Sequence, residues 1–230
     1  MNGHAVFDLD GTLVDSVPVC ADILNAMLAD RGAALRLTHA QSRPHVTRGG
    51  PDMVAALLGP WCGDVGLAIG EFRERYAAEP TPPGSLYPHA RQALAALGER
   101  GIGLAVCSNK PQHLCEKVLG DLQLAGFFAA VVGTGPGVPL KPDPAGLALA
   151  LSRAGGASAR ACYVGDSELD HELARRARVP FVMLTHGYGD YDRDWPGAVR
   201  VGGFATLAAT VGNLLVGDRT PLPRLADAPG

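Results

Sequence analysis

The sequence is poor in the features that mark secreted disulfide proteins, membrane proteins and nucleic-acid-binding proteins. Only five of its 230 residues are cysteine and no two form a Cys-x-x-Cys pair, so we expect reduced thiols in the core instead of disulfides or a metal site. No apolar run reaches the roughly 18 residues that a membrane span needs. The net charge is only −3, and the scattered Lys and Arg residues give no basic surface for nucleic acid.

These absences favour a cytoplasmic protein whose partner is a small molecule. The few residues before Asp8 offer no basic and apolar leader of the secretory kind. The seven histidines show no His-Glu-x-x-His or other metal-binding spacing. With 47% hydrophobic residues, the chain can bury one large core and a smaller second one. The sequence leaves the oligomeric state open.

Short apolar runs alternate with helical stretches along most of the chain. This alternation predicts an α/β fold, a doubly wound parallel sheet with helices on both faces. In such sheets, ligands bind beyond the carboxyl ends of the strands. The predicted strands are Ala5–Leu9, Gly103–Cys107, Ala129–Val132, Ala161–Val164 and Pro180–Leu184.

The first two predicted strands are separated by roughly 90 residues, far more than one crossover helix requires. An inserted helical domain accounts for this length. We expect one helix after the capping residue Ser16, a second that starts at Gly50 and a third over about Asp64–Glu79. The stretch Arg43–Gly50 is expected to be a loop, and the proline-rich stretch Pro80–Gly84 a hinge.

These signals divide the chain into two domains and a tail. Residues 1–15 and 84–216 are expected to form the α/β core domain. Residues 16–83 would form the small helical insertion. The tail at 217–230 is rich in Pro, Arg and Asp and is expected to be disordered.

The most informative feature is a pair of carboxylates, Asp8 and Asp10, placed where the first strand runs into Gly11. Two like charges at the mouth of a buried strand repel one another unless a cation lies between them. The pair therefore indicates a metal site, phosphate chemistry or both. An isolated Asp-x-Asp would be read as ordinary loop carboxylates, so the interpretation depends on the rest of the chain.

Further polar groups follow the other strands at the same edge of the sheet. Ser108 ends the second strand, Lys141 follows the third, and Asp166 and Asp170 follow the fourth. If a helix begins at Ser167, the two aspartates lie on one face near its N-terminus, which favours negative charge. A lysine among several carboxylates offsets their repulsion and can hold a bound anion.

Four motifs in this order are typical of one protein family. The segments FDLDGTLVDS (7–16), SNKP (108–111), KPDP (141–144) and GDSELD (165–170) resemble the haloacid dehalogenase (HAD) superfamily of phosphohydrolases. The resemblance spans almost the whole chain, and the helical insertion is similar to the cap of the phosphoglycolate phosphatase-like branch. It implies a HAD-like Rossmannoid core with a small α-helical cap domain.

The resemblance implies a magnesium-dependent phosphatase acting on a small phosphorylated metabolite. Asp8 would attack phosphorus and become an aspartyl phosphate, and Asp10 would be the general acid and base. Mg²⁺ would be held by the carboxylates of Asp8 and Asp166 and the backbone carbonyl of Asp10. Asp170 would orient a metal-bound water or Lys141.

The resemblance also assigns the groups around the phosphate. Ser108 and Lys141 would act in catalysis by binding phosphate oxygens and stabilising the developing charge. Gly11, Thr12 and Asn109 would contribute to substrate binding. For Asn109 and its neighbour at position 110, a solvated helix start is an equally good interpretation.

Substrate choice in such proteins belongs to the cap. Arg48 could pair with a substrate carboxylate, such as that of 2-phosphoglycolate, although an ordinary surface arginine is the alternative. Pro88-His89 stands where the branch commonly has Pro-Gly, and His171 replaces a usual aliphatic residue, so the substrate stays open.

Other functions fit the sequence less well. A phosphotransferase of the phosphomutase type would use the same core, and a non-catalytic phosphate-binding protein would keep the pocket without turnover. A dehalogenase needs neither Asp10 nor a metal site. A response-regulator receiver carries its phosphorylated Asp on a middle strand and lacks a cap.

Overall fold

One parallel sheet forms the centre of the protein in the computed structural model, which describes residues 3–46 and 49–216. The strand order is β3-β2-β1-β4-β5-β6, and every neighbouring pair is parallel. The prediction of a doubly wound α/β fold is confirmed. The strands are β1 (His4–Phe7), β2 (Gly103–Pro111), β3 (Ala130–Thr134), β4 (Ala161–Gly165), β5 (Phe181–Leu184) and β6 (Ala198–Val201).

The sequence predicted five of these strands and missed β6. This strand pairs only with β5, at the edge of the sheet, and most of it is partly exposed. An edge strand of this kind lacks the continuous apolar run that marks a buried parallel strand. The missed strand carries none of the polar motif residues.

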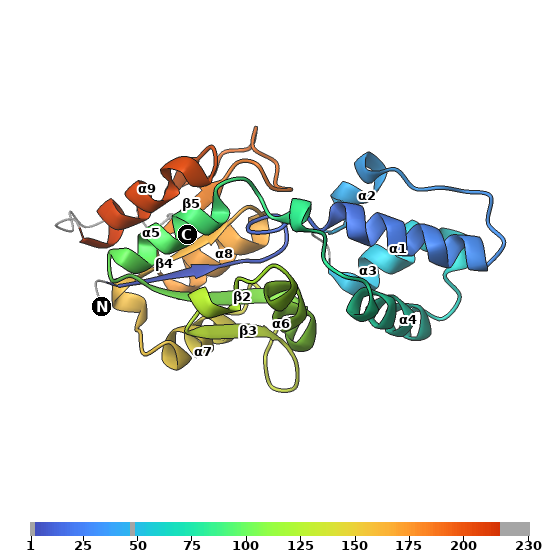
Figure 1. Ribbon diagram of the computed structural model, residues 1–230, viewed down its shortest axis with the longest axis horizontal. Coiled ribbons are helices and arrows are strands. Elements are labelled where there is room, and N and C mark those ends of the chain that lie inside the picture. Colours follow the sequence, from blue (N-terminus) through green and yellow to red (C-terminus); the bar gives the residue numbers. More distant parts are fainter. Residues whose placement is uncertain (1–2, 47–48, 217–230) are drawn as a thin grey trace, which may run out of the picture.

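Helices cover both faces of the sheet (Figure 1). Along β1, Ala5 and Phe7 face one apolar cluster and Val6 faces the other. The first cluster includes residues of α5, α6 and α9, and the second includes residues of α7 and α8. These helices are α5 (Ala90–Glu99), α6 (Gln112–Asp121), α7 (Ala145–Arg153), α8 (Glu168–Ala177) and α9 (Phe204–Val216).

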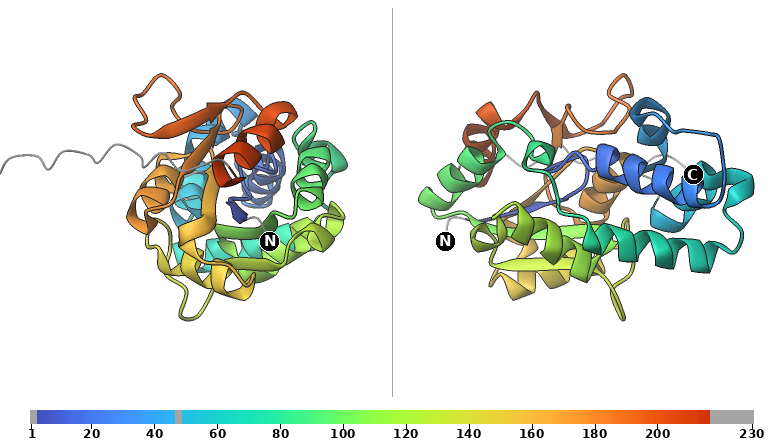
Figure 2. Two further views of the ribbon diagram at one scale, coloured as in Figure 1. Left: turned by 90° about the vertical axis from the view of Figure 1, so that its left-hand side faces the viewer. Right: turned by 45° about the vertical axis from the view of Figure 1, so that its right-hand side comes forward.

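Four further helices form a separate group beyond the carboxyl ends of the strands (Figures 1 and 2). Apolar side chains of this helical group pack on one another, among them Leu24, Leu58 and Tyr76. The helices are α1 (Val17–Asp30), α2 (His39–Val46), α3 (Gly50–Leu58) and α4 (Val65–Ala78).

The structure corrects one prediction in this region. The first half of the stretch 43–50, expected as a loop, belongs to helix α2, which ends at Val46. The sequence hides this helix because Pro44 lies inside it and Ser42 is its one buried residue, so no apolar stripe is present. Arg48 lies outside the described residues, as does the tail at 217–230.

Two chain segments that run side by side connect the helical group to the sheet. Val14 pairs with Leu86 in an antiparallel bridge, and the amide of Asp15 donates to the carbonyl of Ser85 at 2.8 Å. The second segment contains a short 3-10 turn, η2 (Pro83–Ser85). The two connections are thus held to one another at the point where the helical group begins.

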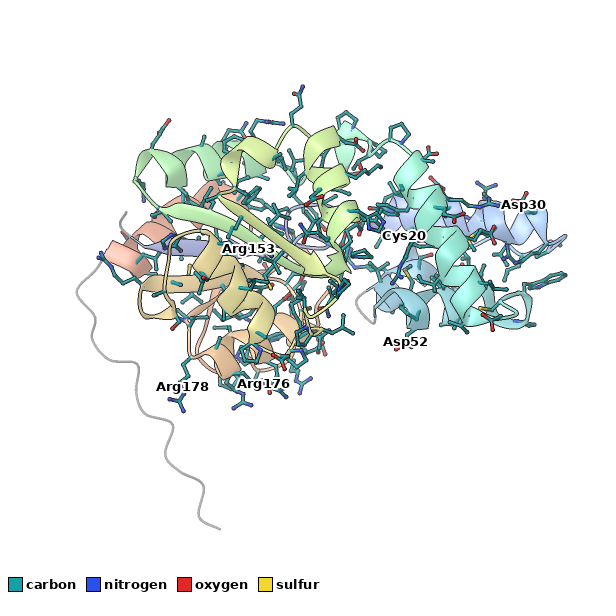
Figure 3. All side chains as sticks on the ribbon, turned by 90° about the horizontal axis from the view of Figure 1, so that it is seen from below. Cys20, Asp30, Asp52, Arg153, Arg176 and Arg178 are labelled. Carbon is teal, nitrogen blue, oxygen red and sulfur yellow. The ribbon has the colours of Figure 1, made fainter. Side chains whose placement is uncertain are left out.

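The cysteines lie within the apolar interior. All five are buried and none is paired in a disulfide. Figure 3 shows Cys20 toward the end of α1 nearest the sheet, with Asp30 at the far end. Burial raises the pKa of the Cys20 thiol to about 12, so the thiol stays protonated at neutral pH.

Among the residues that the structure describes, the helices are too short or too polar, taken singly, to cross a lipid bilayer. Within residues 3–46 and 49–216, no single helix combines the length and apolar character of a membrane span. The segments Gly50–Trp61 and Val65–Ala78 meet the criteria only as a pair bent by 109°.

Candidate active site

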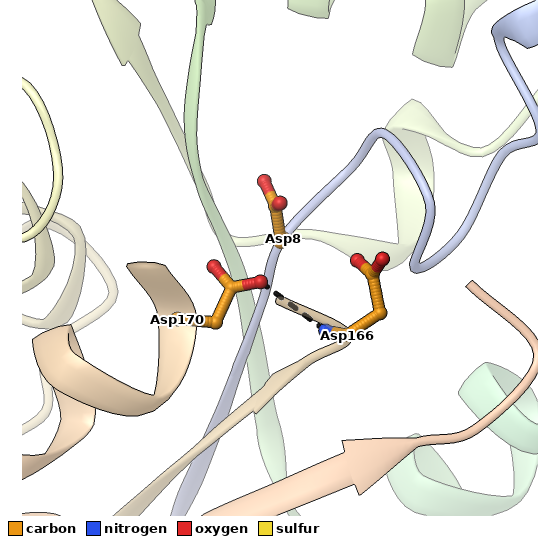
Figure 4. Close-up of side chains that lie close together, drawn as sticks. All are labelled: Asp8, Asp166 and Asp170. Atoms are coloured by element: carbon orange, nitrogen blue, oxygen red, sulfur yellow. Dashed lines mark hydrogen bonds between the residues drawn. The ribbon is translucent and has the colours of Figure 1, made fainter. Parts of the chain in front are cut away.

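Three buried carboxylates meet at the carboxyl edge of the sheet. Asp8 directly follows β1, Asp166 directly follows β4, and Asp170 lies in the first turn of α8. One oxygen of each lies within 4.8 Å of the others (Figure 4). The register explains the meeting, because Phe7 lies opposite Val164 and the chains that leave these two strands begin side by side. The sequence had placed these residues at one edge, and the structure brings them together.

Lys141 lies between two of the carboxylates. Its Nζ is 2.8 Å from Oδ2 of Asp8 and 2.7 Å from Oδ1 of Asp170, and its side chain is 6% exposed. Asn109 holds the lysine backbone, because Oδ1 of Asn109 accepts from the amide of Lys141 at 2.7 Å. Burial lowers the pKa of Lys141, but the attraction of Asp170 and Asp8 outweighs it and raises the pKa above its usual value. Lys141 is therefore a fixed positive charge.

One lysine does not balance three carboxylates. If all are ionised, the cluster carries a net charge of −2. Burial raises the pKa of Asp8 to about 6, and Lys141 only partly offsets this effect. Burial, followed by repulsion from Asp170 and Asp8, raises the pKa of Asp166 well above its usual value. A divalent cation would remove this electrostatic cost.

Both carboxylate oxygens of Asp170 accept hydrogen bonds. Its Oδ2 accepts from the amides of Asp166 and Ser167 at 3.2 and 3.1 Å and from the Ser167 hydroxyl at 2.7 Å. Oδ1 is taken by Lys141. Ser167 and Asp170 also form the capping box of α8. Asp170 thus fixes Lys141 and the turn after β4, and with both oxygens hydrogen-bonded it is less available to a metal ion than Asp8.

The remaining carboxylates differ in this respect. Oδ1 of Asp8 is buried and has no hydrogen-bond partner among the described residues. Both oxygens of Asp166 accept one hydrogen bond each, from the Thr12 hydroxyl at 2.8 Å and from the amide of Tyr188 at 2.6 Å. Each carboxylate oxygen has room for a further ligand. A buried, unpartnered carboxylate oxygen beside a second carboxylate is a suitable start for a metal site.

Gly11 and Thr12 lie beneath this cluster. Gly11 has a φ of +81°, and a Cβ there would lie 2.5 Å from Oδ2 of Asp166, so only glycine fits. Thr12 is fully buried and orients Asp166. Neither residue lines the pocket described below, so their direct contact with substrate remains a prediction.

Sequence reasoning did not anticipate the part played by Tyr188. Its amide fixes Asp166, and its hydroxyl donates to Oδ1 of Asp15 at 2.8 Å. The signal was the pair of glycines on either side of it. A Cβ on Gly187 or Gly189 would collide with Asp166, which explains why this loop carries small residues.

Asp10 is paired with a different lysine. Nζ of Lys110 lies 3.1 Å from Oδ1 and 3.2 Å from Oδ2 of Asp10, and the lysine side chain is 8% exposed. Lys110 is therefore not part of a solvated helix start. The sequence had left that alternative open.

A cavity of about 500 Å³ connects the cluster with the helical group. Asp8, Asp10, Ser108 and Lys141 line one part of it. Residues of α3 and α4 line another part, which lies over the edge of the sheet. Among them are Met53, Ile69, Phe72, Arg73 and Tyr76.

Comparisons with known proteins agree with this geometry. A phosphoglycolate phosphatase from Rhodospirillum rubrum is 37% identical over 194 residues, which are 80% of this chain and 79% of that protein. A phosphoglycolate phosphatase from Xanthomonas campestris pv. campestris is 35% identical over 190 residues, covering 81% and 86% of the two chains.

Solved structures and a family model extend the comparison. The crystal structure of a predicted phosphoglycolate phosphatase from Haemophilus somnus is 26% identical, with a TM-score of 0.76 and coverage of 90% and 97%. CbbY from Rhodobacter sphaeroides, solved with phosphate, is 23% identical with a TM-score of 0.74 and coverage of 90% and 96%, and it shares the fold. The model of haloacid dehalogenase-like hydrolases matches residues 4–178. With its motifs, its fold and these relatives in agreement, the chain belongs to the haloacid dehalogenase-like hydrolase family.

Proposed function

We propose that the protein is a magnesium-dependent phosphatase that hydrolyses a small phosphate monoester through an aspartyl phosphate on Asp8. The observation that carries the proposal is the state of the Asp8 carboxylate. One oxygen is held by Lys141 at 2.8 Å, and the other is buried, unpartnered and beside Asp166. A carboxylate held in this way is poised for attack on phosphorus next to a cation.

The reaction then follows in two transfers. A carboxylate oxygen of Asp8 forms a bond to phosphorus while the bond between phosphorus and the ester oxygen breaks. Asp10 gives a proton to the departing oxygen. In the second transfer Asp10 takes a proton from water, whose oxygen attacks phosphorus and releases Asp8 and inorganic phosphate.

Other residues bind and orient the phosphoryl group. Ser108 lies in the pocket at the end of β2, where its hydroxyl can donate to a phosphate oxygen. Lys141 holds Asp8 in place and places a positive charge beside the transferred group. Asn109 fixes Lys141 from the same loop.

The chemistry of the site fits Mg²⁺. The carboxylates of Asp8 and Asp166 and the backbone carbonyl of Asp10 would hold the ion, and oxygen ligands of this kind are those it prefers. The charge of −2 that the cluster would carry if fully ionised supports this choice, as does the Asp8 oxygen that has no hydrogen-bond partner among the described residues. When bound, the ion would polarise the phosphoryl group and offset the charge of the transition state.

We further propose that the helical group is a cap domain, residues 16–83, inserted into a core formed by residues 1–15 and 84–216. The cavity that it shares with the core supports this assignment. A cap that closes over the pocket would exclude water and protect the aspartyl phosphate.

The proposed substrate is 2-phosphoglycolate or a similar short ester with a second anionic group. Relatives named phosphoglycolate phosphatase at 33–37% identity support it. Of the pocket lysines, Lys141 and Lys110 are both committed to aspartates. Arg73 lines the same pocket and has no ion pair within the described residues, so it is the cation available to a substrate carboxylate. Arg48, the candidate from the sequence, lies outside those residues.

A panel of phosphate esters tests the proposal directly. Purified protein is expected to hydrolyse p-nitrophenyl phosphate and 2-phosphoglycolate when Mg²⁺ is present and to lose turnover in EDTA. Asp8→Asn should lower kcat by at least roughly 10³-fold while the fold is kept. No turnover of any ester by folded protein with Mg²⁺ would favour a non-catalytic binding protein. Transfer of phosphate to a second sugar hydroxyl would favour a phosphomutase.

A further inference from the structure

The ammonium group of Lys110 is enclosed from two sides. On one side its Nζ reaches both oxygens of Asp10, at 3.1 and 3.2 Å. On the other side it lies 4.1 Å from the centre of the Tyr76 ring. A buried lysine needs such partners, because it has lost most of its hydration.

The two partners come from different parts of the molecule. Asp10 follows β1 in the sheet, whereas Tyr76 lies in α4 of the helical group. The Tyr76 ring is 1% exposed and packs against Phe72 with ring centres 5.9 Å apart. Figure 2 shows α4 next to α6, the helix that follows Lys110. The helical group thus supplies one of the two contacts that fix the lysine.

A second lysine shows what a merely structural contact looks like here. Lys117 of α6 lies 5.5 Å from the centre of the same Tyr76 ring. Its other partners are Asp121 at 2.9 Å, the Thr81 hydroxyl at 3.2 Å and the carbonyl of Glu79, none of which belongs to the carboxylate cluster. Lys117 therefore contacts the same ring without touching Asp10. It provides a matched control.

We propose that Lys110 is a positioning residue that orients the carboxyl group of Asp10 toward the leaving oxygen. Because Tyr76 of the helical group contacts Lys110, this orientation depends on the helical group being docked on the sheet. The proposal rests on the proposed phosphatase function. In this role one Asp10 oxygen keeps its contact with Lys110, while the other turns to the ester oxygen and passes it the proton. When the helical group moves away, Tyr76 leaves the ammonium, water reaches it, and Asp10 is no longer held.

This arrangement would limit proton donation by Asp10 to the state in which the helical group is docked on the sheet. An ester that needs protonation of its leaving group would then react only with the helical group docked over it. An ester with a good leaving group would depend less on this contact. The dependence on the leaving group therefore separates positioning of Asp10 from general stabilisation of the fold.

The experiment measures kcat/KM for ethyl phosphate and for p-nitrophenyl phosphate, because kcat/KM reports the steps up to departure of the leaving group. Lys110→Met is expected to lower kcat/KM for ethyl phosphate about 10- to 100-fold more than for p-nitrophenyl phosphate. Lys110→Arg should restore most of the loss. Lys117→Met should leave the ratio between the two esters at the wild-type value.

Tyr76 variants test the dependence on the helical group and do not require loss of the lysine. Tyr76→Phe keeps the aromatic face beside the ammonium and removes only the hydroxyl, so it should retain most of the wild-type ratio between the two esters. Tyr76→Leu should change the ratio in the same direction as Lys110→Met. Thermal unfolding of every variant shows whether it is folded at the assay temperature, and Tyr76→Leu decides the question if Lys110→Met is not.

The outcomes separate the two proposals. An active wild type with an unchanged ester ratio in Lys110→Met and Tyr76→Leu overturns the positioning role alone. An equal loss on both esters assigns Lys110 to structure only and also overturns it. A folded wild type that hydrolyses neither ester with Mg²⁺ overturns the phosphatase function, and this proposal with it.

Discussion

The amide of Tyr188 donates a 2.6 Å hydrogen bond to Oδ2 of Asp166. The same tyrosine donates through its hydroxyl to Asp15 and accepts from the amide of Ser16, both at 2.8 Å. Asp15 and Ser16 belong to the first connection to the helical group. One residue therefore contacts both a proposed metal ligand and the segment on which the helical group would turn.

The loop around Tyr188 has no room for a larger residue. A Cβ at Gly187 would collide with the carbonyl of Gly11 and with the Asp166 side chain. Gly187→Ala is expected to displace Asp166, to lower kcat/KM at least roughly 10-fold and to cost about 1–3 kcal/mol of stability. Gly202→Ala is the control, because a Cβ there meets nothing within 4 Å. Urea unfolding and turnover of p-nitrophenyl phosphate measure both effects, and equal behaviour of the two variants would contradict the prediction.

Lys141 should matter for stability as well as for turnover. Lys141→Met leaves Asp8 and Asp170 buried without their cation, which is expected to cost about 3–5 kcal/mol of unfolding free energy. The control is Arg176→Met, whose ion pair with Glu172 lies on the surface and should contribute little to stability. Urea denaturation without added metal gives both values. A loss at Lys141 no larger than at Arg176 would contradict the electrostatic account of the cluster.

Metal binding can be measured without catalysis. Mg²⁺ at about 100 times its dissociation constant should stabilise the wild type by about 2.7 kcal/mol, seen as a rise in Tm. Asp166→Asn should lose most of this rise. Glu168→Gln, two positions away on the exposed start of α8, should keep it. A full Mg²⁺-dependent rise in Asp166→Asn would place the ion elsewhere.

Arg73 is expected to distinguish esters with and without a second anion. Arg73→Gln should lower kcat/KM for 2-phosphoglycolate about 10- to 100-fold, because a hydrogen bond to a charged group is lost, and leave ethyl phosphate unchanged. Arg73→Lys should retain part of the selectivity. If Arg73→Gln lowers kcat/KM equally for both esters, Arg73 does not bind the substrate carboxylate.

An ion pair within the helical group gives a pH-dependent prediction. Hydrogen bonds from Arg31, outweighing burial, lower the pKa of Glu71, which lies 2.6 Å from that guanidinium. A lowered carboxyl pKa adds stability above the usual value of about 4.3, and this stability is lost as the pH falls through the folded-state pKa.

Glu71→Gln is therefore expected to be less stable by about 0.5 kcal/mol at pH 7 and to match the wild type in acid. Glu74→Gln, an exposed change on the same helix, should show no such difference at either pH. Thermal unfolding at several pH values gives the comparison. A deficit in Glu71→Gln that persists at pH 3 would assign the effect to packing.

The sequence was sufficient for the fold class because strand and helix signals are local. Apolar runs of parallel strands and the long gap before Gly103 predicted the sheet and the helical insertion, and the structure has both. The elements it missed, α2 and β6, are those with weak local signals. Only one residue of α2 is buried, and β6 is an edge strand.

The sequence by itself also determined which polar groups would gather, because Asp8 and Asp166 follow parallel strands and Ser108 lies in the last part of a third, and these strands end at one edge. Only the tertiary structure decided how those groups are paired. Lys110 binds Asp10 across 100 positions of chain, Asp170 is hydrogen-bonded through both oxygens, and Tyr188 holds Asp166. Such pairings depend on the packing of the helical group and on which oxygen each donor reaches. No local pattern of residues encodes either of these.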